Sequence, residues 1–175
     1  MVLSDPFNGT WTIDLAESKV WDHAQGRHVP DEVGEEVITL RIENGVQEYE
    51  VLYGDSPKFR MGYTAQYDAK EWADYAVREI ISTSGDPKAE TEAFKQRIKA
   101  DSGEASRQLE LGKTYALVRL VYIDEQTHYR IGRNPLTGGA PSVLSRRLAE
   151  DGQSYLTHLM DNTGTVFRIR KFVRA

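Results

Sequence analysis

The chain opens, at residues 5–15, with the stretch DPFNGTWTIDL, and this stretch decides the fold. Asn8-Gly9 is a dipeptide typical of tight turns. After it, Trp11, Ile13 and Leu15 alternate onto one face of a short strand. An aromatic residue, a turn and a strand with a buried tryptophan are typical of a segment that plugs a larger structure, so we predict that Trp11 is buried.

Residues 16–22 are predicted to form a capped helical turn that carries a second tryptophan, Trp21, as part of the same plug. The following segment, residues 22–33, is polar, contains glycine and proline and has no periodicity, so it is predicted to be a loop. Its histidines, His23 and His28, are then expected to face solvent.

Most of the remaining chain alternates between apolar and polar residues in short runs, each followed by turn residues, as in half-buried strands. At residues 59–67 the odd positions are apolar or aromatic and are predicted to face inward. One surface helix is expected, with Asp86 as its N-cap, Phe94 and Ile98 on one face, and an end at Ser102-Gly103. The other strands are predicted at residues 36–42, 47–53, 77–83, 115–122, 128–133, 143–148, 155–160 and 166–173.

These connections leave no room for crossover helices, so the sheet is predicted to be antiparallel. About eight to ten strands are enough to close a sheet into a barrel with a ligand-sized interior. A length of 175 residues, with no linker-like segment, predicts a single domain over residues 1–175. The predicted fold class is therefore an all-β, antiparallel up-and-down barrel with a short N-terminal helical turn.

A Gly-x-Trp opening strand followed by hairpins resembles the calycin superfamily of lipocalins and fatty-acid-binding proteins. The pattern Phe-x-Gly-Thr-Trp-x-x-(Asp/Asn)-x-x-x-Ser-Lys, together with YTAQYD at residues 63–68, is most similar to uncharacterised bacterial lipocalin-like proteins. The resemblance implies a calycin-like barrel whose base is closed by Trp11, packed under Arg168 or Arg170 of the last strand. Fatty-acid-binding proteins hold the ligand carboxylate with Arg-x-Tyr in that strand, whereas this chain has arginine at both positions. A solvated, outward-facing pair is the alternative for these two arginines.

Aromatic and basic residues on the predicted strands are the candidates for chemistry. His128 with Arg130, or Arg119 with His158, would place a titratable base beside a permanent cation if the pair faced inward. After residue 113 both faces of the strands are mixed, so the facing of these residues stays open. The candidate catalytic residues are His128 and His158, and the candidate ligand-binding residues are Tyr63, Tyr67, Tyr115, Arg119, Arg130, Arg168 and Arg170.

The function that fits such a barrel best is binding of a small hydrophobic molecule, aromatic and with an acidic or phenolic group. The alternative is a cofactor-free lyase, isomerase or hydratase that uses His or Tyr as its acid and base in the same cavity. A barrel with a filled interior that binds a partner is a third hypothesis, since one fold hosts many functions. No motif indicates a cofactor or a metal site.

Composition and charge narrow the range of possible binding partners and cellular locations. The net charge is −5 and the arginines alternate with apolar residues, which argues against nucleic acid as a partner. No run is long and apolar enough for a membrane span, and the amino terminus lacks a signal-peptide pattern. With no cysteine either, the sequence favours a cytoplasmic protein, or an exported one if a leader has been removed, acting as a monomer or homodimer.

Overall fold

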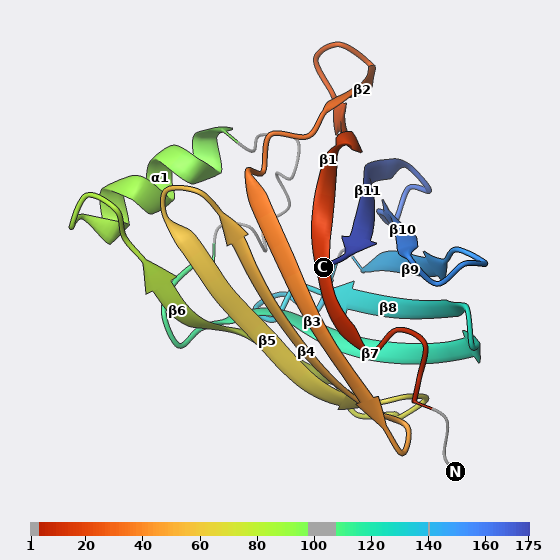
Figure 1. Ribbon diagram of the computed structural model, residues 1–175. Helices are drawn as coiled ribbons and strands as arrows, with labels where there is room; N and C mark the ends of the chain where they lie inside the picture. Colours follow the sequence, from red (N-terminus) through yellow and green to blue (C-terminus); the bar gives the residue numbers. More distant parts are fainter. Residues whose placement is uncertain (1–3, 98–107, 140) are drawn as a thin grey trace.

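Eleven antiparallel strands form one sheet, and β1 also pairs with β11, so that all strands except β2 close into a ring of ten (Figure 1). The computed structural model describes residues 4–97, 108–139 and 141–175. The strands are β1 (Gly9–Asp22), β2 (Arg27–Pro30), β3 (Glu35–Glu43), β4 (Val46–Gly54), β5 (Lys58–Gln66), β6 (Ala73–Ile81), β7 (Thr114–Asp124), β8 (Thr127–Arg133), β9 (Ser142–Leu148), β10 (Ser154–Met160) and β11 (Val166–Arg174).

The prediction of an all-β, antiparallel, calycin-like barrel is confirmed. Every strand expected from alternation is present, and β7 to β11 follow one another as a meander. The odd positions of β5, from Phe59 to Ala65, are buried, and Tyr67 just beyond the strand is buried too. These residues face the core because side chains alternate between the two faces of a strand.

The expected helical turn at residues 16–22 is wrong, because β1 continues through it as a strand. The register of β1 against β11 shifts between Asp14 and Lys19, which marks a β-bulge, and Leu15 is exposed there instead of facing the core. Ser18 is buried at the bulge. Its Oγ donates to the carbonyl of Asp14 at 2.7 Å and accepts from the N–H of Lys171 at 3.2 Å, so it replaces part of the interrupted ladder.

The segment predicted as a loop instead contains β2, which pairs with the end of β1 in a hairpin (Figure 1). Trp21 lies in this hairpin, half-buried and edge-on to His28 at 5.1 Å between ring centroids. It is therefore not part of the plug, contrary to expectation. His23 is exposed, whereas His28 is half-buried and its Nε2 lies 2.8 Å from the carbonyl of Val166.

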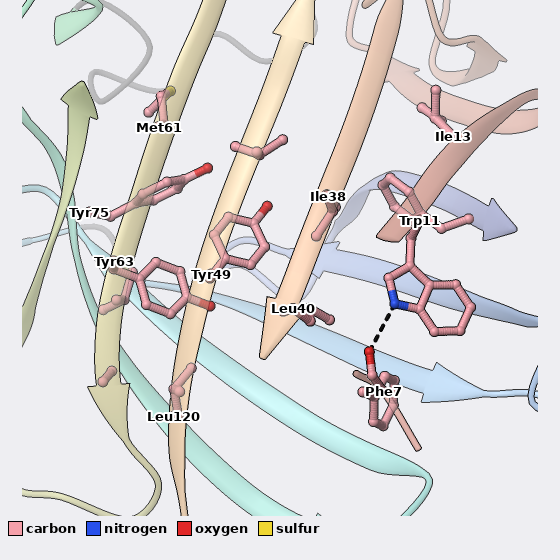
Figure 2. Packing of buried hydrophobic residues seen from close by; sticks show 14 of the residues in the cluster. Phe7, Trp11, Ile13, Ile38, Leu40, Tyr49, Met61, Tyr63, Tyr75 and Leu120 are labelled. Atoms are coloured by element: carbon pink, nitrogen blue, oxygen red, sulfur yellow. Dashed lines mark hydrogen bonds between the residues drawn. The ribbon is translucent and has the colours of Figure 1, made fainter. Parts of the chain in front are cut away.

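Trp11 closes the barrel together with Phe7, and both are fully buried. The indole Nε1–H donates to the carbonyl of Phe7 at 2.9 Å (Figure 2). A guanidinium from the last strand lies over the ring at 4.1 Å, as the resemblance implied, but it belongs to Arg174 and not to Arg168 or Arg170. Arg174 lies at the end of β11, directly opposite Trp11 on β1. Because it lies an even number of residues from Arg168 and Arg170 along the strand, it shares their inward face.

The Arg174 side chain also ties the first and last segments of the chain together. It donates to the carbonyls of Asn8 and Pro6, each at 2.9 Å, and to the carbonyl of Gly152. Gly9 is required beneath it, since its φ is +133° and a Cβ there would lie 2.8 Å from Nη1 of Arg174. Arg174, which fits because residue 9 has no side chain, thus reinforces the closure that the β1–β11 pairing makes.

The surface helix α1 (Pro87–Arg97) begins as predicted, with Asp86 Oδ1 accepting from the N–H of Ala89 at 3.1 Å. Phe94 is fully buried and packs on Phe59 of β5, with ring centroids 5.1 Å apart. The expected contribution of Ile98 and the expected end at Ser102-Gly103 lie outside the described residues. Among the described residues, no helix is long and apolar enough to cross a membrane.

Replacing Trp11 by alanine should lower the free energy of unfolding by about 3 to 5 kcal/mol, the usual cost of truncating a fully buried aromatic side chain. The measurement is urea unfolding followed by circular dichroism. Trp21→Ala is the matched control, since Trp21 is half-buried in the hairpin that the end of β1 forms with β2, and it should cost much less. An unfolding midpoint of Trp11→Ala equal to that of the control would disprove the role of Trp11 as the closure of the barrel.

Candidate functional site

Alternation along β8, β9 and β11 directs arginines into the barrel. On β8, His128 and Arg130 share the inward face, and on β9 the buried residues are Leu144, Arg146 and Leu148. Arg146 was missed by the sequence-based prediction, although its position between two leucines at i−2 and i+2 is a signal for the inward face.

A cavity of about 50 Å³ lies inside the barrel, which is room for about three to five water molecules. Its charged lining residues are Glu36, Arg130, Arg146, Arg168 and Arg170. The remaining lining residues are mainly aromatic or aliphatic, namely Val33, Ile38, Tyr49, Tyr53, Tyr75, Tyr115, Leu144, Thr157 and Phe172. Of the predicted ligand-binding residues, Tyr115, Arg130, Arg168 and Arg170 therefore meet at one place.

Arg170 is buried in a double ion pair, which rules out the solvated, outward-facing alternative for this residue. Its Nε lies 2.6 Å from Oδ2 of Asp31, and its Nη1 lies 2.9 Å from Oε2 of Glu36. Burial alone would raise the pKa of Asp31, but the Arg170 guanidinium outweighs burial and holds that pKa below its usual value. Through Arg170, the last strand is thus tied to Asp31, which precedes β3, and to Glu36, which lies in β3.

Arg130 and Arg146 have no such partner. Nη1 of Arg130 and Nε of Arg146 are buried without a hydrogen bond, and among the described residues neither guanidinium forms an ion pair with a carboxylate. Arg130 instead lies over the rings of Tyr49 and Tyr75, at 5.3 Å from each centroid. Arginine stays charged even when it is buried, so the cavity holds two cations that are not in an ion pair with any of the described residues.

The phenols around the cavity cannot supply the missing negative charge. Burial raises the pKa of Tyr49, and it raises the pKa values of Tyr75 and Tyr155 well above the usual value, so all three are neutral at physiological pH. Burial would lower the pKa of Arg146, but Tyr155 and the other nearby tyrosines outweigh it, while Arg130 acts to lower it. Arg130 and Arg146 lie on the adjacent strands β8 and β9, so the two cations repel each other on one wall of the cavity.

Tyr63 and Tyr67 belong to a buried hydrogen-bond chain beside the cavity and do not line it. Tyr63 donates to Oε1 of Gln47 at 2.7 Å, and Nε2 of Gln47 donates to the hydroxyl of Tyr67 at 2.6 Å. The hydroxyl of Tyr67 is also hydrogen-bonded to Nδ1 of His128, at 2.8 Å, and Nε2 of His128 is buried without a hydrogen-bond partner.

The predicted catalytic histidines do not meet in the cavity. His128 is 1% exposed, and burial, helped by the charge of Arg146, lowers its pKa to about 4, so it is neutral at physiological pH. His158 alternates with the buried Thr157 and Leu159 and therefore faces outward. None of the four histidines lines the cavity.

Arg119 also faces outward, so the expected pairing of Arg119 with His158 inside the barrel is wrong. Its guanidinium lies 4.6 Å from the ring centroid of Trp72, and Arg133 lies over the same ring at 4.2 Å. The residues on either side of Arg119, Val118 and Leu120, occupy the inward positions and are buried.

No group of three or more potential metal ligands is placed to hold a metal ion in the described part of the chain.

Comparisons with known proteins bear on the fold. No protein-family model matches the sequence, and no curated protein matches it. Among solved structures, the chain is similar to a Schistosoma mansoni fatty acid binding protein in complex with arachidonic acid. The TM-score is 0.56 at 12% sequence identity, and the match covers 98% of each chain. At this identity the likeness shows the fold alone, a calycin-like barrel.

The neutral, buried His128 should make stability depend on pH. In the unfolded chain a histidine binds a proton near pH 6.5, whereas folded His128 stays neutral down to about pH 4. The contribution of neutral His128 to the free energy of unfolding is therefore fully present above pH 6.5. It decreases by about 3 kcal/mol as the pH falls from 6.5 toward 4. Measured by urea unfolding at a series of pH values, this loss should be absent in His128→Gln and retained in His23→Gln, where the histidine is exposed. An unchanged pH dependence in His128→Gln would contradict the assignment.

Proposed function

We propose that the protein binds a small, largely apolar molecule that carries an acidic group and an aromatic ring, with the acidic group in the central cavity. The observation that carries this proposal is the pair Arg130 and Arg146, two cations at one cavity without a carboxylate partner among the described residues. Such a pair is unfavourable in a protein interior unless an anion joins it, and guanidinium groups bind carboxylates with two parallel hydrogen bonds.

The size of the cavity indicates which part of the ligand would occupy it. Pockets for whole drug-sized ligands measure about 300 to 1,000 Å³. A cavity of about 50 Å³ holds an acidic head group, and the apolar part would lie against Tyr53 and Tyr115, which are half-buried. The edge-on contact of Tyr115 with Tyr75, at 5.5 Å, is a geometry that a ligand ring could extend. Binding would then require these side chains to shift.

The neighbouring residues have secondary roles in this proposal. Arg168 and Arg170 line the same cavity, although Arg170 is already engaged by Asp31 and Glu36.

The fold likeness supports a barrel that holds a small hydrophobic molecule, since that solved structure is described as a complex with arachidonic acid. A lyase, isomerase or hydratase has no specific observation in its favour, because no histidine lies at the cavity.

Replacing Arg130 or Arg146 by an uncharged residue should weaken the binding of acids more than the binding of neutral analogues. In Arg130→Met or Arg146→Met, the affinity for 3-phenylpropionate, measured by isothermal titration calorimetry, should fall by about ten- to a hundredfold, as expected for the loss of a charged hydrogen bond. The affinity for the neutral 3-phenylpropanol should change by less than about threefold.

Arg147→Met is the matched control, because Arg147 follows Arg146 on the same strand and is exposed. It should leave both affinities unchanged. If all three variants weakened the acid and the alcohol equally, the two arginines would have no role in holding an acidic group and the proposal would fail.

A further inference from the structure

The cavity also contains a carboxylate, Glu36, whose charge is opposite to that of Arg130 and Arg146. Glu36 is 7% exposed and uses only Oε2 to bind Nη1 of Arg170, at 2.9 Å. Within the described part of the chain, no hydrogen bond is formed with its second oxygen, Oε1. A carboxylate inside a protein normally accepts several hydrogen bonds, so Oε1 is an acceptor that a ligand can use.

Arginines outnumber carboxylates at the cavity. Among the described residues that line it, Glu36 is the one carboxylate, beside Arg130, Arg146, Arg168 and Arg170. Glu36 and Asp31 both bind Arg170, and Arg168 also acts on Asp31. A ligand in this space of about 50 Å³ would therefore meet several guanidinium groups and one carboxylate at the same time.

Tyr49 lines the cavity together with both kinds of charge. The guanidinium of Arg130 lies over its ring, 5.3 Å from the centroid, and Glu36 lines the same cavity. Burial raises the pKa of Tyr49, Arg130 acts to lower it and Glu36 acts to raise it, in keeping with this geometry.

Taking the proposed function as its premise, we infer that the ligand carries a hydrogen-bond donor beside its acidic group and that Glu36 selects for this donor. The class of ligand is a 2-hydroxy or 2-amino acid with an apolar, aromatic side group. Its carboxylate binds between Arg130 and Arg146, and its hydroxyl or amino group donates to Oε1 of Glu36.

The protein should favour donor-bearing acids over plain acids because it costs free energy to leave Oε1 of Glu36 without a hydrogen-bond donor. A plain acid of the same shape would satisfy the arginines but would cover Oε1 and separate it from water. Sites built to hydrogen-bond a polar group discriminate against analogues that lack the group, because the polar atom of the protein is then buried and unpaired. Glu36 is thus a specificity-determining residue of the cavity, and Arg130 and Arg146 supply the affinity.

The test compares three acids of nearly equal size by isothermal titration calorimetry: 3-phenylpropionate, 3-phenyllactate and phenylalanine. We expect at least one of the two donor-bearing acids to bind about tenfold or more tightly than 3-phenylpropionate. In Glu36→Gln the side-chain oxygen can still accept from Arg170, which leaves the amide N–H₂ facing the ligand. The advantage of the donor-bearing acids should therefore fall to less than about threefold.

A second ligand series keeps the test independent of the variant's stability. 2-Methoxy-3-phenylpropionate retains the acid and the ring of 3-phenyllactate but lacks the donor, so the wild-type protein should bind it as weakly as 3-phenylpropionate or more weakly. Equal affinity for all of these acids would overturn the inference, as would a donor advantage that survives in Glu36→Gln. The proposed function would stand in both cases if Arg130→Met and Arg146→Met still weakened the acids. If none of the acids bound to the wild-type protein, the proposed function and this inference would both fail.

Discussion

The contact between Arg174 and Trp11 is the interaction on which the rest of the structure depends, because it holds the last strand against the first. The ring of strands closes through β1 and β11, and Arg174 also binds carbonyls on both sides of that closure. Closure brings β8 and β9 to face the first strands, so that Arg130 and Arg146 share one cavity with Glu36. Charges in a protein interior interact more strongly than charges in water, so the closure sets the electrostatic character of the cavity.

The positions of the strands could be predicted from the sequence because turns and alternation are local signals. Asn44-Gly45, for example, joins β3 and β4 in full register, as an Asn-Gly pair between two alternating runs indicates. The bulge in β1 could not be predicted, since residues 16–19 resemble a helical start, whereas pairing with β2 and β11 and the contacts of Ser18 with Asp14 and Lys171 hold them as part of a strand. Local patterns do not report such distant partners.

The facing of the later strands could not be predicted either, and for a physical reason. Polar residues such as Arg146 and His128 point inward, while Ile131 and Val143 on the same strands point outward, so hydrophobicity does not separate the two faces. Pairing across strands resolves the ambiguity: His128 lies opposite Arg146, and Arg146 lies opposite Thr157. Most of the candidate site was therefore hidden in contacts between residues far apart in the sequence.

Strand β2 has a further consequence for how the protein behaves in concentrated solution. An unpaired strand edge can recruit another chain and start aggregation. Closure removes such edges from the ring, and among the described strands only β2 pairs with a single neighbour. This edge is four residues long and ends at Pro30, which has no N–H to donate, and His28 ties it to Val166. This open edge of the described sheet is thus too short and too constrained to act as a template for intermolecular sheet growth.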